Sequence, residues 1–439
     1  SDVACRTYFD FSKEKGWLCA IEQCNGSGDC RKSYAFGGTM CPSFRATREE
    51  SHTTRARANT LRELITHPRT KKIYDQREIL EVLDTCVSCK ACKSECPSNV
   101  DIARFKAEFL QQHYDVCGVP MKAFLIARLT EIQRLGTILP WFYNAIVRNR
   151  MTGNMLKRIL HFAPKRTIPT LYKTTLKHWL GRYRRKNRGE TVGKVFLFAD
   201  EFTNYMDVEI GIKMIELLDW LGYEVIIPKH VESGRTAISK GMLEVAKGVA
   251  RKNVLLLKDL VTENIPLVGI EPSCILSFRD EYPDLVGEDL KEEAVRLGKN
   301  CLLYDEFFTR EIRAGRIQAE QFTDQPLKIM LHGHCHQKSL ASVEPSREML
   351  SLPVNYSVEV IPSGCCGMAG AFGYEKKHYE LSMKIGEQVL FPAVRGAGEN
   401  VCISAPGTSC RQQIKDGTGK QALHPIEVLY EALKCTKEK

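Results

Sequence analysis

Short apolar segments alternate with helical sequence from residue 193 to the end of the chain. This alternation is typical of α/β structure, in which helices connect the strands of parallel sheets. The candidate strands are VFLFAD (195–200), EVIIP (224–228), PLVGIEP (266–272), CLLYD (301–305), KIMLHG (328–333), VEVIP (358–362), NVCISAP (400–406) and ALHP (422–425).

The same succession of segments occurs twice. EVIIPKHVESGRTAISKG matches VEVIPSGCCGMAGAFG, PLVGIEPSCILSFRD matches VCISAPGTSCRQQIK, and CLLYDEFFTREI matches ALHPIEVLYEAL. An internal repeat of this kind indicates duplicated structural units. We therefore predict two pseudo-symmetric repeats with parallel sheets, at residues 193–322 and 323–439.

The first half of the chain has a different pattern. Residues 1–120 contain two groups of cysteines separated by sequence in which Leu61, Leu64 and Ile65 have helical spacing. Residues 121–192 also have a mainly helical pattern and end in the polar run GRYRRKNRGET. These features predict a helical N-terminal domain followed by a helical connecting segment.

Positive charge is concentrated in that connecting segment. Residues 148–188 contain 13 Lys or Arg and no Asp or Glu, against a net charge of +10 for the whole chain. Tyr172, Trp179 and Tyr183 lie among these cations. An anionic membrane surface, an acidic partner or a solvated helical face would each suit such a segment. No nucleic-acid motif accompanies the charge, so nucleic acid is not expected as a partner.

Cysteine is the unusual feature of the composition, with 18 among 439 residues. The first twenty residues lack the apolar core of a signal peptide, and no run of 18 apolar residues is present. In a reducing cytoplasm, clustered thiols bind metal more often than they form disulfides. We expect a cytoplasmic metalloprotein, peripheral at the inner face of the membrane if the basic segment binds lipid. The cysteines without a cluster context, which we predict to be structural, are Cys5, Cys117, Cys301, Cys402 and Cys435.

Four cysteines near residue 90 form the pattern C-x2-C-x2-C-x3-C-P: Cys86, Cys89, Cys92 and Cys96, followed by Pro97. Iron in a cubane cluster prefers soft thiolate ligands, and two-residue gaps let consecutive thiols surround one cluster. The pattern predicts an α-helical ferredoxin-type domain at 1–120 that binds a [4Fe–4S] cluster. Structural zinc is the alternative.

A second, incomplete motif precedes the first. Cys24, Ser27 and Cys30 keep the two-residue gaps, and Cys41 stands before a proline. In two-cluster ferredoxins the fourth cysteine of each motif binds the other cluster. This exchange would place Cys41 with Cys86, Cys89 and Cys92, and would leave Cys24, Cys30 and Cys96 at the second site. That site would suit a [3Fe–4S] cluster, or a [4Fe–4S] cluster with Ser27 or Cys19 as an additional ligand. If it is empty, Cys96 completes the first cluster instead.

A third group of cysteines falls at the carboxyl ends of predicted strands in the second repeat. Its members are Cys335, Cys365, Cys366 and Cys410. Such strand ends converge on one crevice in an open parallel sheet, so we predict one metal site there. The neighbouring histidines are further candidates, with His336 and His334 preferred to His332 for their proximity to Cys335. In the first repeat only Cys274 matches a cysteine, opposite Cys410, so that repeat has kept the scaffold and lost most ligands.

These residues carry a family resemblance. The C-terminal repeats resemble the cysteine-rich CCG domains of heterodisulfide reductase subunits and of glycolate oxidase iron–sulfur subunits, whose C…CCG…C-x2-C motif holds a non-cubane [4Fe–4S] cluster. Here Gly407 stands where the first cysteine of the last pair belongs. The stretches EQCNGSGDCRK and GGTMCPSFRATREESHTTRARANTLRE resemble the region after the flavin domain of fused FAD-linked oxidases, the D-lactate and D-2-hydroxyglutarate dehydrogenases.

The resemblance implies an iron–sulfur, electron-transfer portion of an FAD-linked 2-hydroxyacid oxidoreductase. FAD would lie on a domain or subunit outside this sequence, which would then be cut from a larger protein. The electrons would pass to an acceptor such as quinone. The CCG cysteines would hold a non-cubane cluster or another metal. Two alternatives are direct, heterodisulfide reductase-like catalysis at the CCG site and a structural zinc protein. No general base or nucleophile is expected on this chain.

Overall fold

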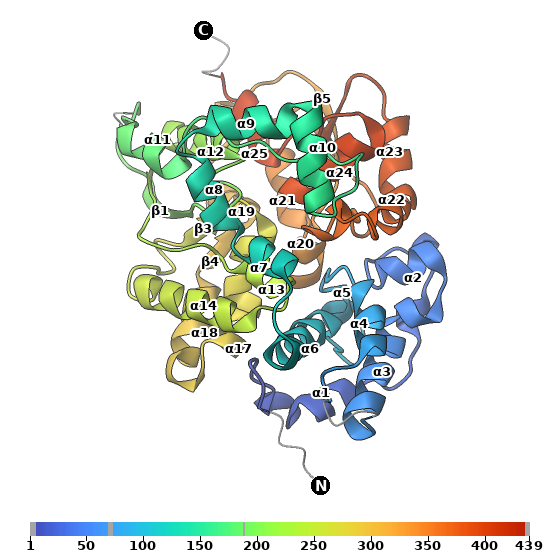
Figure 1. The fold of residues 1–439 in the computed structure, drawn as a ribbon. Helices are drawn as coiled ribbons and strands as arrows, with labels where there is room; N and C mark the ends of the chain where they lie inside the picture. Colours follow the sequence, from blue (N-terminus) through green and yellow to red (C-terminus); the bar gives the residue numbers. More distant parts are fainter. Residues whose placement is uncertain (1–5, 69–72, 188, 435–439) are drawn as a thin grey trace.

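The computed structural model describes residues 6–68, 73–187 and 189–434. Its first part is a group of short helices, drawn in blue in Figure 1, that share one apolar core. Within α3, Leu61, Leu64 and Ile65 are buried, as their spacing predicts. The elements of this part are η1 (Ser12–Glu14), α1 (Trp17–Glu22), η2 (Asp29–Arg31), η3 (Tyr34–Phe36), α2 (Pro42–Thr47), η4 (Glu50–His52), α3 (Thr54–Thr66), α4 (Arg77–Asp84), α5 (Ala91–Glu95) and α6 (Ile102–Cys117).

Within the described residues the connecting segment forms five further helices, of which α9 and α10 lie near the top of Figure 1. Asn149 separates two of them, because its side chain accepts hydrogen bonds from the first amides of α10. The five are α7 (Met121–Ala127), α8 (Leu129–Gly136), α9 (Pro140–Arg148), α10 (Arg150–Ile159) and α11 (Leu176–Arg182). Among the described residues, no helix combines the length and the apolar character needed to cross a bilayer.

The first sheet has four parallel strands in the order β2-β1-β3-β4. Its strands are β1 (Gly193–Phe198), β2 (Tyr223–Ile226), β3 (Leu267–Gly269) and β4 (Cys301–Leu303). The helices around it are α12 (Val208–Trp220), α13 (Arg235–Ser239), α14 (Leu243–Leu257), α15 (Pro272–Ile275), α16 (Ser277–Asp280), α17 (Tyr282–Leu285), α18 (Lys291–Lys299) and α19 (Tyr304–Arg313), with η5 (Glu288–Leu290) and η6 (Ala319–Gln321).

The second sheet has three parallel strands in the order β6-β5-β7. Its strands are β5 (Leu327–Leu331), β6 (Tyr356–Val360) and β7 (Val401–Ser404). Its helices are α20 (Cys335–Leu340), α21 (Glu344–Leu350), α22 (Tyr379–Glu387), α23 (Leu390–Gly396), α24 (Thr408–Thr418) and α25 (Pro425–Glu431), with η7 (Phe372–Tyr374). In both sheets the first strand along the chain is flanked by the second on one side and the third on the other.

The predicted strand ALHP is not a strand in this structure. Leu423 makes only an isolated parallel bridge to Ser404, and α25 begins two residues later. The His424 side chain accepts a hydrogen bond from the amide of Ile426, and Pro425 occupies the first helical turn. These start signals favour the helix over a longer strand. The other seven predicted strands correspond to β1–β7.

A buried group of charges joins the helical N-terminal part to the first α/β part. The Lys90 ammonium, 3% exposed, lies 2.7 Å from a carboxylate oxygen of Asp280, 3.1 Å from one of Glu281 and 3.4 Å from one of Asp101. The second α/β part contacts the same region through α20, which packs against α5. Both α/β parts therefore rest on the segment that carries the C-x2-C-x2-C motif.

Candidate metal centre

Four cysteines of the N-terminal part line a single cavity. Cys41, Cys86, Cys89 and Cys92 all border the same space. Cys41 immediately precedes α2, Cys86 and Cys89 lie in the loop after α4, and Cys92 lies in α5. Cys96, at the end of α5, does not border this space. The structure thus brings together the four thiols that the exchange of fourth ligands predicts for one cluster.

Left-handed backbone turns shape this cavity. Cys41, Ser88 and Lys90 have φ angles of 53°, 49° and 65°, a region that residues other than glycine seldom adopt. Such strain persists only where surrounding contacts impose it, and it gathers at functional sites. Beside Cys41 the contacts are polar, because the amide of Thr54 donates to Sγ over 3.0 Å. The local chain is therefore folded around its thiols.

The electrostatics of this cavity disfavour free thiolates. Burial, together with the neighbouring Cys335 and Cys92 thiols, raises the pKa of Cys89 well above its ordinary value. Burial also raises the pKa of Cys92. A bound cation is what stabilises the ionised form of such thiols. The pocket is therefore suited to thiolates that carry metal.

The thiols predicted for the second site are more dispersed. Cys30 is buried and its thiol contacts that of Cys41, while Cys24 and Cys96 are half-buried. Arg55 interacts electrostatically with both Cys24 and Cys30. The proposed additional ligands, Cys19 and Ser27, are both exposed.

The CCG cysteines form one buried chain of contacts. Cys335 contacts Cys365, Cys365 contacts Cys366, and Cys366 contacts Cys410. They come from the carboxyl ends of β5, β6 and β7, as predicted: Cys335 begins α20, the pair lies in the loop after β6, and Cys410 lies in the first turn of α24. Lys338, which is half-buried, interacts electrostatically with all four thiols. Its cation would offset thiolate charge, and its place in the sequence gave no sign of this contact.

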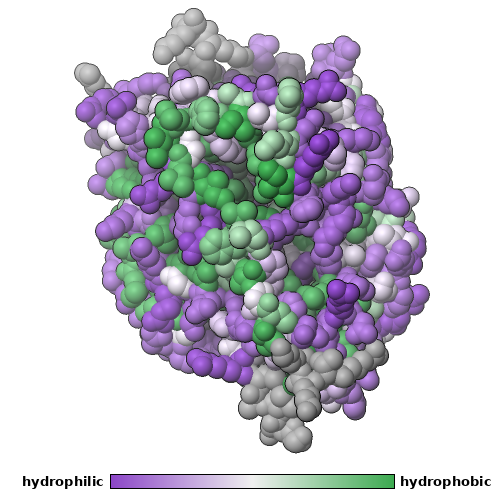
Figure 2. Space-filling model, viewed as in Figure 1, coloured by the Kyte–Doolittle hydropathy of each residue, from purple (hydrophilic) through white to green (hydrophobic). Residues whose placement is uncertain are grey.

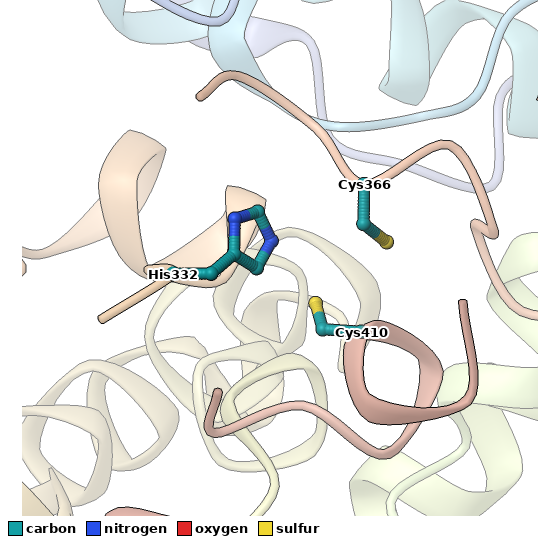
Figure 3. Close-up of side chains that lie close together, drawn as sticks. All are labelled: His332, Cys366 and Cys410. Atoms are coloured by element: carbon teal, nitrogen blue, oxygen red, sulfur yellow. The ribbon is translucent and has the colours of Figure 1, made fainter. Parts of the chain in front are cut away.

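The three histidines near Cys335 have different surroundings. A ring nitrogen of His332 and the sulfur atoms of Cys366 and Cys410 lie within 4.8 Å of one another, and the two sulfur atoms lie beside the imidazole ring (Figure 3). The rings of His334 and His336 stack with centroids 5.3 Å apart and lie beside Cys335.

Gly407 marks where the chain departs from the CCG pattern. A Cβ atom at this position would lie 2.5 Å from Cδ2 of His334 and 3.2 Å from Sγ of Cys410. The imidazole of His334 therefore occupies the space next to the missing cysteine.

Cys274 lies apart from these thiols, with Asp200 and Glu201 at the carboxyl end of β1. The Asp200 carboxylate accepts hydrogen bonds from Thr203, and the Glu201 carboxylate accepts them from Ser233. Burial raises the pKa of Asp200 to about 8. These partners explain the cluster structurally. Of the cysteines predicted to be structural, Cys5 and Cys435 lie outside the described residues.

The two thiol groups are neighbours. The Cys89 and Cys335 thiols interact electrostatically, and the Ser339 hydroxyl donates to the backbone oxygen of Cys89 over 3.1 Å. Residues 250 positions apart in the chain thus join the ferredoxin-type loop to α20. The two cysteine-lined sites therefore lie close to one another in the fold.

Residues 23–101 match the family model of the 4Fe-4S dicluster domain. The chain is also similar to D-2-hydroxyglutarate dehydrogenase of Escherichia coli (strain K12), with 26% identity over 460 residues, covering 95% of this chain and 44% of that protein. One component of the anaerobic glycerol-3-phosphate dehydrogenase of the same organism is 26% identical over 339 residues, covering 77% of this chain and 83% of that component. Lactate utilization protein A of Bacillus subtilis (strain 168) is 27% identical over 248 residues, which are 54% of this chain and 98% of that protein.

These matches confirm the predicted resemblance to the iron–sulfur part of oxidoreductases. The matched domain is one that carries 4Fe-4S clusters, and two of the three relatives are named as dehydrogenases or their components. The chain spans less than half the length of the D-2-hydroxyglutarate dehydrogenases that it matches.

Proposed function

We propose that this chain is the iron–sulfur, electron-transfer portion of an FAD-linked 2-hydroxyacid oxidoreductase and conducts electrons from a flavin toward an acceptor such as quinone. The observation that carries the proposal is the cavity lined by four cysteines within the matched 4Fe-4S domain. When bound, iron–sulfur clusters supply one-electron transfer, and a flavin on another domain or subunit supplies the two-electron oxidation of the substrate.

We assign Cys41, Cys86, Cys89 and Cys92 to one [4Fe–4S] cluster. Four thiols and no other soft donors border the cavity, which is the ligand set that such a cluster prefers. The remaining thiols, Cys24, Cys30 and Cys96, would hold a second cluster of the [3Fe–4S] or [4Fe–4S] type.

The surrounding residues tune the first site. The amide of Thr54 donates to Sγ of Cys41, and the buried ammonium of Lys106 donates to the backbone oxygen of Cys86 over 2.7 Å. Hydrogen bonds to sulfur and nearby positive charge both favour the reduced, more negative state of a cluster. These residues would therefore raise the reduction potential of a cluster bound here relative to the same site without them.

The CCG thiols would hold the next redox centre along the electron-transfer path. Cys335, Cys365, Cys366 and Cys410 would hold a non-cubane iron–sulfur cluster or another metal, with Lys338 balancing their charge. The electrostatic interaction between the Cys89 and Cys335 thiols supports a short path between the two sites.

Replacing Cys41 and Cys96 separately tests the assignment. The full chain is purified anaerobically, its iron and sulfide are counted, and the dithionite-reduced protein is examined by electron paramagnetic resonance. We expect Cys41→Ser to abolish or alter the signal of the cluster bound by the C-x2-C-x2-C loop, and Cys96→Ser to leave that signal intact. Cys402→Ser, in strand β7, is the control and should resemble the wild type. Loss of the signal in Cys96→Ser alone would show a self-contained site, and a colourless zinc protein would refute electron transfer.

An exposed apolar surface supports contact with a membrane. Figure 2 shows hydrophobic side chains gathered over the region where Figure 1 places α8, α9 and α10. Trp141 is 68% exposed and Met151 83% exposed. The larger exposed apolar side chains of this surface are Leu135, Ile138, Leu139, Trp141, Phe142, Met151, Met155 and Ile159.

Positive charge accompanies this surface. Arg148, Arg150 and Arg158 are exposed and make no ion pair within the described part of the chain. Other members of the basic segment serve the fold: Arg166 is buried and paired with Asp416 at 3.1 Å. Apolar side chains flanked by free cations are typical of helices that lie in the interface of an anionic bilayer. We propose that α8–α10 contact such a bilayer, from which a quinone could be reached.

Vesicle flotation tests this contact. The wild type should float with vesicles containing anionic phospholipid and bind less at high salt or to neutral vesicles. Trp141→Glu should weaken binding at least tenfold, whereas Val354→Glu, at an equally exposed apolar residue before β6, should not. Equal binding by Trp141→Glu and wild type would refute the membrane contact, and would favour a protein partner for this surface.

We also propose that the two sheets derive from one repeated unit. Their shared strand order supports this, as does the placement of Cys274 and Cys410 after the third strand of each.

A further inference from the structure

His332 lies beside two members of the buried thiol group, Cys366 and Cys410. It directly follows β5, is 0% exposed, and its amide donates to the backbone oxygen of Ser404 over 2.8 Å. That bond continues the pairing of β5 with β7, so the imidazole is fixed at the carboxyl ends of three adjacent strands. Cys366 and Cys410 reach the same place from the segments that follow β6 and β7 (Figure 3).

The hydrogen bonds of the ring specify which nitrogen is free. The Ser363 hydroxyl lies 2.7 Å from Nδ1 of His332 and itself donates to the backbone oxygen of Ile361 over 3.4 Å. When the Ser363 proton is directed to that carbonyl, the Ser363 oxygen accepts the Nδ1 proton. Nε2 is then left as an unprotonated nitrogen with its lone pair available.

Nε2 is fully buried, and within the described part of the chain it makes no hydrogen bond of ordinary geometry, although the Cys366 thiol interacts with the ring. A nitrogen of this ring lies within 4.8 Å of Sγ of Cys366 and Sγ of Cys410. Because Nδ1 faces Ser363, Nε2 is the nitrogen turned toward the two sulfur atoms. A buried acceptor without a partner is costly, and a metal ion would satisfy it. Histidines that bind metal in proteins almost always donate their other ring proton to an oxygen, which is the arrangement seen at Ser363.

His334 lacks these properties. Its Nδ1 accepts the amide proton of His336 over 3.2 Å, so the neutral ring carries its proton on Nε2. That nitrogen lies 3.8 Å from a carboxylate oxygen of Glu271. A protonated nitrogen facing a carboxylate cannot bind a cation without a change of tautomer.

We propose that His332 coordinates, through Nε2, the metal that Cys366 and Cys410 bind, with Ser363 as the positioning residue. The inference rests on the proposed function of the thiol group and reverses the preference for His334 and His336 that sequence proximity suggested. Two thiolates and one imidazole suit iron or zinc.

The test uses the full chain, purified anaerobically from cells supplied with ¹⁵N-labelled histidine. Iron and zinc are counted by mass spectrometry, and pulsed electron paramagnetic resonance measures the coupling of histidine nitrogen to the paramagnetic centre. The wild type should show a histidine coupling. His332→Gln should lose it and release metal to a chelator at least tenfold faster, and Ser363→Ala should show a smaller effect of the same kind. If the site holds zinc, the chelator rate and the zinc count carry the test.

His334→Gln is the matched control, because it changes a buried histidine of the same loop. It should keep both the coupling and the metal. Near-ultraviolet absorption of the ferredoxin-type clusters shows that each variant is folded. Wild-type coupling and metal retention in His332→Gln would overturn the inference. A wild type with no metal beyond the N-terminal clusters would refute the proposed function of the thiol group instead, so the two failures are distinguishable.

Discussion

Replacing Lys90 by Met should destabilise the protein and loosen the loop that binds the first cluster. Lys90 lies between Cys89 and Cys92, and its ammonium contacts Asp101, Asp280 and Glu281 in a space from which water is excluded. Methionine has nearly the same length and can adopt the same backbone, so the main change is the loss of one buried positive charge. The three carboxylates then repel one another without their shared partner.

The size of the loss follows from the partners that remain. Removing one member of a buried ion pair typically costs about 3–5 kcal/mol. Here Asp280 keeps its contact with Lys93, and Glu281 keeps Arg235 at 2.6 Å. The low end of that range, about 3 kcal/mol of unfolding free energy, is therefore expected. Lys93→Met should cost about 1 kcal/mol or less, because Lys93 is 38% exposed.

Urea unfolding of the anaerobic protein measures both variants, followed by circular dichroism and by cluster absorbance. Adding Asp280→Asn to Lys90→Met should recover at least about 1 kcal/mol relative to the sum of the single changes. A Lys90→Met protein within about 1 kcal/mol of wild type would refute the reasoning, since the buried carboxylates would then have found other compensation.

Three further changes have distinct outcomes. Gly407→Ala adds a Cβ atom 2.5 Å from the His334 ring at a position whose φ is an ordinary −79°. This substitution should lower the unfolding free energy by about 1–3 kcal/mol and reduce the metal bound at the thiol group. Gly398→Ala, where the nearest atom beyond the adjoining residues is 4.0 Å from the new Cβ, should do neither. Burial raises the pKa of Asp305 to about 7, so the folded state holds this proton more tightly than the unfolded state. Stability should then fall as the pH rises from the unfolded-state pKa to the folded-state pKa, and should level off above about pH 7. Between pH 6 and pH 8 the wild type should lose about 1 kcal/mol more unfolding free energy than Asp305→Asn. Identical pH profiles of the two proteins would contradict this. Arg166→Met removes a buried cation that binds the Gln413 side chain at 2.7 Å, and should lower the melting temperature by several degrees, in contrast to the exposed Arg158→Met.

The sequence was sufficient where chemistry and spacing are local. The two-residue gaps from Cys86 to Cys92 place these thiols around one space because the intervening turns are short. The alternation of apolar segments located β1–β7 for the same reason, since each strand shows its own pattern. A pairing rule of two-cluster domains, rather than spacing, predicted that Cys41 joins these thiols, and Cys41 borders the same space.

The remaining features depend on contacts between distant residues. The histidine most suited to bind metal was ranked last by proximity, because its tautomer is set by Ser363, 31 residues away. Lys338 gave no signal in its sequence neighbourhood, and its role became visible only once α20 had placed it over the thiols. Equally, Trp141 has the apolar character of a core residue, and only the packing shows that it is 68% exposed.

Gly364 has a consequence for how electrons would move. A Cβ atom at this position would lie 3.3 Å from the backbone oxygen of Gly38 and 3.4 Å from Cα of Thr39. The loop that carries Cys365 therefore touches the main chain of the segment leading to Cys41, with no side chain between them. Carriers that shuttle a mobile domain between donor and acceptor slow down as the solvent becomes more viscous. Backbone contact of this kind opposes relative motion of the two loops, so we expect transfer between the two sites to proceed at the same rate in buffer and in concentrated glycerol.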